Sequence, residues 1–148
     1  MRVVLQRVSR ASVTVDGERT SEIGPGYLLL VGIGADDGPD EVERMAEKVF
    51  NLRVFADEDH KMNLSLSEVG GEILVVSQFT LYGDVTKGRR PSWTSAAPPG
   101  IAEERVEALA KGLEARGVRV GRGVFGAHME VELANDGPVT LILDAAAL

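Results

Sequence analysis

The sequence predicts a single α+β domain in which two helices pack on a mostly antiparallel or mixed, barrel-like β-sheet. Two amphipathic segments have the 3.6-residue period of helices, and some eight short segments have the β-branched or alternating character of strands. No internal repeat or linker divides residues 1–148, and 44% hydrophobic residues suffice for one core. We therefore expect one domain over the whole chain.

The chain is expected to open with antiparallel strands. β-Branched residues run through Met1 to Val15, and Asp16-Gly17 is a strong hairpin signal before Glu18 to Ile23. A buried apolar strand is predicted over Tyr27 to Ile33, after a Gly-Pro-Gly break.

Two segments predict helices. In the first, acidic residues occupy the opening turn, and apolar residues recur at helical spacing: Val42, Met45, Ala46 and Val49. The second is expected over Ile101 to Arg116, with Gly117 at the position that commonly follows a helix. Each has one apolar face, and we expect the first helix to pack on the sheet.

The remaining segments predict short strands. They are Leu52 to Phe55, followed by a polar loop over residues 56–71, then Val118 to Val124 with a basic face, Met129 to Leu133, and a closing strand over Val139 to Leu143. A turn at Asn135 to Pro138 should separate the last two strands.

The stretch from Glu72 to Tyr82 begins with apolar residues typical of a core and ends with residues that could take part in catalysis. Its apolar run, Ile73 to Val76, predicts a strand that is covered on both faces. Polar and aromatic groups then follow where the strand emerges: Ser77, Gln78, Phe79 and Thr80. If the backbone stays extended, Gln78 and Thr80 point to one side and Ser77 and Phe79 to the other.

These residues favour main-chain chemistry. The only histidines, His60 and His128, are poor candidates for a base that activates Ser77, and no nucleophile elbow surrounds that serine. The N–H groups of Phe79 and Thr80, with the Gln78 amide, suit an oxyanion site whose nucleophile comes from water or the substrate. Ordinary strand-end hydroxyls that bond to the backbone are the alternative.

A long irregular segment from Gly83 to Gly100 carries a candidate nucleic-acid site. The chain has a net charge of −7, but residues 85–123 hold eight basic and four acidic side chains. Lys87, Arg89 and Arg90 beside Trp93 combine cations with an aromatic ring, as in sites that grip single-stranded nucleic acid. Anchoring of the loop on the core by Trp93 is the alternative. The basic strand residues Arg119 and Arg122 are expected to extend this patch.

Other classes of site are not expected. The chain has no cysteine, no phosphate-binding glycine loop and no apolar run of transmembrane length, so we expect no cofactor, no membrane partner and a cytoplasmic location. The acidic residues around His60 match neither an EF-hand nor a zinc pattern, and we predict no metal site.

The sequence resembles the D-aminoacyl-tRNA deacylase family. The family's Ser-Gln-Phe-Thr-Leu motif is present as Ser77 to Leu81, and its Asn-x-Gly-Pro-Val-Thr motif as Asn135 to Thr140. Shorter matches extend the likeness over almost the whole chain: Gln6-Arg7-Val8, Ala11-Ser12-Val13, Lys61-Met62-Asn63, Lys87-Gly88, Arg90-Pro91-Ser92, and Phe125-Gly126-Ala127 with Met129. The chain departs from the family at Trp93, where Phe is usual, and at His60, where Gly is common.

The resemblance implies an enzyme that hydrolyses the ester between a D-amino acid, or glycine, and the terminal adenosine of tRNA. It implies a cytoplasmic homodimer in which a cis Gly137-Pro138 peptide reaches into the partner's pocket and excludes L-amino acids. Arg7 would help to hold that motif, and Met129 would contribute to substrate binding. The ribose 2′-hydroxyl of the substrate, or alternatively Thr80, would assist the attack.

Two other classes of function remain open at this point. One is a non-catalytic module that captures the single-stranded end of an RNA with the loop at residues 87–93. The other is a conventional Ser/Thr esterase that acts on small substrates.

Overall fold

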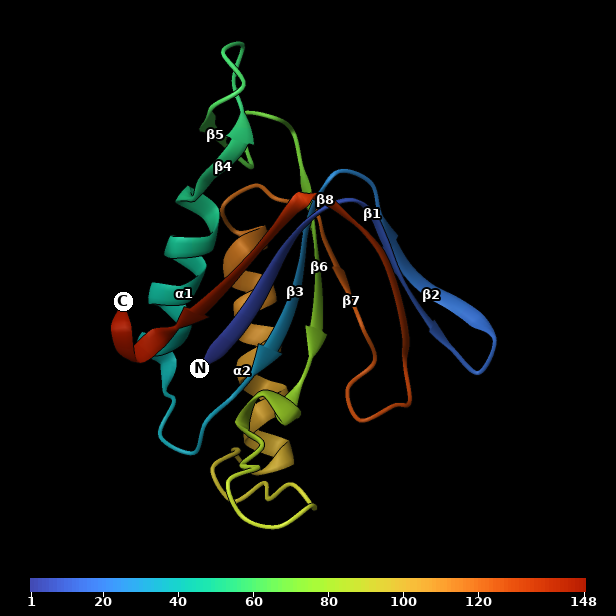
Figure 1. Ribbon diagram of the computed structural model, residues 1–148, viewed down its shortest axis with the longest axis vertical. Coiled ribbons are helices and arrows are strands. Elements are labelled where there is room, and N and C mark those ends of the chain that lie inside the picture. The colour runs from blue at the N-terminus through green and yellow to red at the C-terminus, as the bar shows by residue number, and fades with distance from the viewer.

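The computed structural model describes residues 1–148, and its sheet has the strand order β2-β1-β3-β6-β7, with β8 also paired to β1 (Figure 1). The elements in chain order are β1 (Arg2–Val15), β2 (Glu18–Ile23), β3 (Gly26–Gly32), α1 (Pro39–Asn51), β4 (Arg53–Ala56), β5 (Met62–Ser65), β6 (Glu72–Ser77), η1 (Phe79–Tyr82), α2 (Pro99–Glu114), β7 (Val120–Arg122), β8 (Glu130–Asp144) and η2 (Ala145–Ala147). β6 runs parallel to β3 and β7, whereas β1 is antiparallel to β2, β3 and β8. The predicted class, a mixed and nearly barrel-like sheet with two helices, is confirmed.

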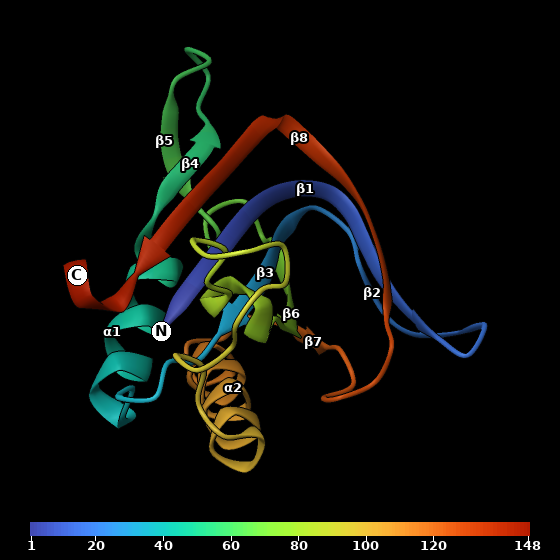
Figure 2. The same cartoon turned by 60° about the horizontal axis from the view of Figure 1, so that its bottom comes forward.

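β6 is covered on both faces, as its apolar run predicts. Ile73 and Val75 belong to a core that includes Met45 of α1 and Leu109 of α2. Leu74 and Val76 belong to a second core, formed where the sheet folds over itself. Figure 2 shows β1 and β8 arching over the centre of the sheet, with both helices on the other side. The end of β6 is therefore a rigid platform.

Three local expectations are corrected. Glu130–Asp144 forms one bent strand, β8, rather than two strands and a turn, because β1 supplies backbone partners on both sides of the bend. The polar loop at residues 56–71 contains a strand, β5, which pairs with β4 in a projecting hairpin. Extended structure ends at Ser77, where a 3₁₀ turn replaces the expected alternation. No helix is long and apolar enough to cross a membrane.

Candidate active site

The Ser-Gln-Phe-Thr motif lies where β6 ends and η1 begins. Ser77 is the last residue of the strand, and Gln78 anchors the crossing by donating its N–H to the Val31 carbonyl at 2.7 Å. The first hydrogen bond within the turn runs from the N–H of Leu81 to the carbonyl of Gln78. The N–H groups of Phe79 and Thr80 consequently have no acceptor inside the turn.

The side chains of the motif form a small cluster at the surface. The Gln78 amide donates to the hydroxyl oxygen of Thr80, so these two side chains share a side of the turn. Phe79 is 54% exposed, and its ring meets the edge of Trp93 with the centroids 5.1 Å apart. The hydroxyl of Thr80 thus has an amide partner and no imidazole or carboxylate beside it.

A cavity of about 530 Å³ opens beside the motif. Ser77 and Gln78 contribute polar groups to its lining, and most of the remaining lining is apolar, from the end of β3, the segment before α2, α2 itself and the loop after β7. A second cavity, of about 540 Å³, lies on the other side of Ser77 and carries Glu103, Glu104 and Arg122 at its wall. Phe125 and Val106 line both cavities. No sequence pattern predicted a place for these two residues in the site, although Phe125 belongs to a motif that carries the family resemblance.

Met129 lies near the same end of the sheet. Its sulfur accepts from the N–H of Val124 at 3.4 Å and packs so closely on Gly123 that a Cβ there would be 2.7 Å from it. Gly123 donates its N–H to the Val75 carbonyl, which ties this segment to the end of β6. Met129 therefore lies near the end of β6, but it lines neither cavity, and its role in substrate binding stays a prediction.

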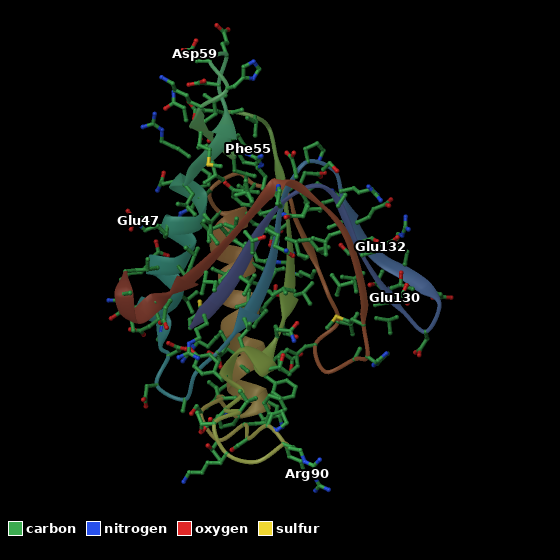
Figure 3. The ribbon with its side chains drawn as sticks, in the orientation of Figure 1. Glu47, Phe55, Asp59, Arg90, Glu130 and Glu132 are labelled. Atoms are coloured by element: carbon green, nitrogen blue, oxygen red, sulfur yellow. The ribbon has the colours of Figure 1, made fainter.

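The basic loop projects beyond this end of the molecule. The N–H and carbonyl groups of Asp84 and Ser92 pair at 2.8 and 2.9 Å and close the loop at its base. Lys87, Arg89 and Arg90 are exposed beyond that closure and form no ion pair. In Figure 3, Arg90 points away from the body at one end of the long axis, with Asp59 at the other end.

Trp93 packs on neighbouring residues and is also partly exposed. It is 40% exposed and lines the 530 Å³ cavity, yet its ring also packs on Phe79 and over Gly83. The tryptophan therefore anchors the loop while presenting part of its ring to the cavity.

Arg119 and Arg122 do not extend the basic patch, and this expectation is corrected. Arg122 is bound by Glu107, at 2.9 Å, and by Glu114, and both carboxylates lie on α2. These contacts raise the pKa of Arg122, and the pKa of Glu114 is lowered by the same guanidinium. Arg119 pairs with Glu72 at the start of β6. Both cations are neutralised within the fold, because α2 and β6 supply carboxylates that are distant in sequence.

Gly137 and Pro138 lie at the bend of β8, and their peptide bond is cis, as the resemblance implies. Arg7 holds this bend: it donates to the Asp136 carbonyl at 3.2 Å and to the Val54 carbonyl at 2.5 Å, and its side chain is only 12% exposed. A Cβ on Gly137 would lie 2.9 Å from the Arg7 guanidinium. The amide of Asn135 completes the support by donating to the Arg7 and Val139 carbonyls, both at 2.9 Å.

Within one chain, this bend is far from the Ser77 motif. Arg7 pairs with Tyr27 on β3, and Tyr27 pairs with Ile73, so the bend is level with the start of β6. Ser77 is four residues further along, or about 13 Å, and β6 is three strands away from β8 at about 4.8 Å per step. The bend of β8 and the turn after β6 lie at opposite ends of the sheet in Figure 1.

Comparison with known proteins identifies the family. The profile of the D-Tyr-tRNA(Tyr) deacylase family matches residues 4–144. Over 148 residues the chain is 61% identical to the D-aminoacyl-tRNA deacylase of Thermomicrobium roseum, covering 100% of this chain and 96% of the relative. It is 57% identical to the enzyme of that name from Roseiflexus castenholzii, covering 99% and 93% of the two chains. The chain belongs to the D-Tyr-tRNA(Tyr) deacylase family.

Solved structures agree with this assignment. The structure of a protein named c-Myc DNA Unwinding Element Binding Protein matches with a TM-score of 0.90 at 44% identity, covering 97% of this chain and 98% of that one. A probable eukaryotic D-amino acid tRNA deacylase matches with a TM-score of 0.82 at 20% identity, covering 96% and 97%, which shows a shared fold. The family predicted from the sequence is confirmed, and with it the prediction of an enzyme of the deacylase type.

Proposed function

We propose that this chain hydrolyses the ester between a D-amino acid, or glycine, and the terminal adenosine of tRNA, as a cytoplasmic proofreading enzyme of translation. The family match over residues 4–144 carries the proposal. The cavity beside Ser77 supports it, because about 530 Å³ lies within the size range of small-molecule sites.

The turn after β6 suits the stabilisation of an oxyanion. Water adds to the ester carbonyl carbon, and the negative charge that forms on the carbonyl oxygen is met by the N–H groups of Phe79 and Thr80. The tetrahedral intermediate then collapses with cleavage of the bond to the ribose 3′-oxygen, which takes up a proton. Free amino acid and tRNA leave the pocket.

The attack needs a proton acceptor, and we assign that role to the ribose 2′-hydroxyl of the substrate. The surroundings of Thr80 support this choice, since its hydroxyl oxygen is met by the Gln78 amide rather than by a base. A tRNA that ends in 2′-deoxyadenosine should then be a poor substrate. Thr80→Ala should retain activity within about tenfold, and a loss of roughly 10³-fold with intact tRNA binding would instead make the side chain essential to the chemical step.

Rejection of L-amino acids is assigned to the bend at Gly137 and Pro138. D and L groups share every substituent, so the filter must be an obstacle where the L side chain would lie. Both residues are exposed, and Arg7 and Asn135 fix the main chain beneath them. Their distance from Ser77 in one chain supports a homodimer in which each bend enters the partner's pocket. Glycine, which lacks a Cβ, would pass the filter.

The acceptor end of tRNA is assigned to the exposed cations of the loop. Lys87, Arg89 and Arg90 lie on the same exposed loop as Trp93, which lines the cavity, so we assign to them the phosphates next to the terminal adenosine. Partial exposure of the Trp93 ring allows a base to stack on it.

The decisive experiment is a deacylation assay on tRNAs that carry D-tyrosine, L-tyrosine and glycine. We expect release of D-tyrosine and glycine and an intact L-tyrosyl ester. Protection of the D-tyrosyl ester would indicate a binding module, and equal activity on simple esters without RNA would indicate a general esterase. Equal hydrolysis of D- and L-tyrosyl-tRNA would refute the filter.

A further inference from the structure

Two glycines at the end of β3 let the 3₁₀ turn pack directly on the strand. A Cβ at Gly32 would lie 2.9 Å from the Gln78 carbonyl oxygen, and one at Gly34 would lie 2.9 Å from three atoms of the Tyr82 ring. Neither glycine has a positive φ. Space, rather than backbone conformation, therefore requires glycine at both positions.

Tyr82, the last residue of the turn, is held from three sides. Its ring rests on Gly34, and its hydroxyl donates to Asp37 at 3.3 Å. Asp37 in turn accepts the N–H of Gly34 at 2.6 Å, so one carboxylate joins the end of β3 to the ring that lies on it. Arg2 covers the ring at 4.7 Å from its centroid.

Arg2 also fixes the main chain of the turn. Its guanidinium donates to the Leu81 carbonyl at 3.3 Å and pairs with Asp144 at the end of β8 at the same distance. Burial, and then the nearby Asp37 carboxylate, raise the pKa of Tyr82, so its hydroxyl remains a donor at neutral pH. The end of the turn is thus tied to β1, β3 and β8.

We propose that Tyr82 is a positioning residue, which fixes the N–H groups of Phe79 and Thr80 for the chemical step. This inference rests on the proposed function, because those N–H groups matter only if they meet an oxyanion. Tyr82 is the last residue of a four-residue turn, and the bond from the Gly83 N–H to the Thr80 carbonyl, at 3.0 Å, spans it. Because the turn is short and hydrogen-bonded, a displacement of the Tyr82 ring should also displace Phe79 and Thr80 at the start of the turn.

A steric probe at Gly34 tests the inference. Gly34→Ala places a methyl group in the volume of the Tyr82 ring, and the ring has little freedom to move because Asp37 and Arg2 hold it. A shift of about 1 Å in a catalytic group can cost up to roughly 100-fold, so we expect kcat to fall by roughly 10- to 100-fold. KM for D-tyrosyl-tRNA should change little, because the loop cations lie beyond the turn.

A double-mutant cycle separates positioning from a general loss of structure. Tyr82→Leu removes the ring atoms that the new methyl group would meet, so adding Gly34→Ala to that variant should cost less than about threefold in kcat. Gly112→Ala is the matched control, because a Cβ there makes only ordinary contacts, with the Ala46 Cβ at 3.5 Å and the Arg116 guanidinium at 3.7 Å, and kcat should stay unchanged. Additive losses, or an unaffected kcat in Gly34→Ala, would overturn the inference.

Tyr82→Phe provides a second test, in which the substitution introduces no steric clash into the fold. It keeps the ring and removes only the hydrogen bond to Asp37, for which we expect a loss in kcat of roughly 2- to 10-fold at constant KM. An unchanged kcat would count against positioning through this bond. If wild-type protein leaves D-tyrosyl-tRNA intact, the proposed function fails and the inference with it; wild-type activity with an additive cycle refutes the inference alone.

Discussion

The loop cations provide the sharpest test of the proposed tRNA site. Lys87, Arg89 and Arg90 are exposed and have no carboxylate partner, so each is available to a phosphate. Replacing all three by Ala removes three positive charges from a loop whose base is closed by the Asp84 and Ser92 main-chain pair. We expect the fold to be unaffected and the affinity for tRNA to fall.

The size of the effect follows from counterion release. Each phosphate contact with single-stranded nucleic acid contributes about 0.7 to the slope of log affinity against log salt, so three contacts contribute about 2. A fourfold rise in salt concentration should therefore weaken binding of the wild-type protein roughly 18-fold more than binding of the triple variant. The two proteins should become nearly equal in affinity at high salt.

Fluorescence titration with uncharged tRNA across a range of salt concentrations measures both slopes. The matched control is Arg119→Ala with Arg122→Ala, which removes cations that Glu72, Glu107 and Glu114 already neutralise. The control should keep the wild-type slope. An unchanged slope in the triple variant, or a larger change in the control, would show that the RNA site lies elsewhere.

Three further predictions concern the stability of the fold. Leu74→Ala should lower the free energy of unfolding by about 2–5 kcal/mol in urea titrations, because loss of the fully buried side chain leaves a cavity in the second core. The pKa of Glu72 is lowered, first by the Gly24 N–H and then by Arg119, so its contribution to stability is present above about pH 4.3 and is lost as the pH falls through the lowered pKa. Glu72→Gln should consequently be less stable at pH 7 and lose less stability on acidification, as urea titrations at several pH values would measure. His60 has a φ of 60°, and His60→Gly should raise the free energy of unfolding by less than about 1 kcal/mol in urea titrations, because relief of the left-handed conformation outweighs the entropy of glycine in the unfolded chain.

Local sequence patterns predicted the parts of the fold that depend on local physics. The aliphatic run before Ser77 predicted burial on both faces, and both cores contain its residues. The spacing of Val42, Met45, Ala46 and Val49 predicted the buried face of α1. The resemblance implies that glycine is common at position 60, and the left-handed backbone that His60 adopts here, with a φ of 60°, explains that preference.

The errors arose where distant segments decide the outcome. The Asn135 to Pro138 turn signal is real, but β1, some 130 residues earlier, keeps the flanking segments in one strand. From the sequence alone Arg122 is expected to be a free cation, because the ion pairs with Glu107 and Glu114 form only when α2 packs beside β7. The need for glycine at positions 32 and 34 was not predicted, because no local pattern reveals that the turn after β6 will pack on them.

The separation of the Gly137 bend from the Ser77 turn has a consequence for mixed assemblies. A pocket that needs both elements must take one from each of two chains, since a single chain holds them at opposite ends of its sheet. In the homodimer that we propose, a protomer with a damaged turn and a protomer with a damaged bend should then complement each other. Their heterodimer would contain one pocket with both the damaged turn and the damaged bend, and one pocket with neither. Mixing two variants that are inactive or unselective alone should therefore restore half of the normal number of active sites per dimer.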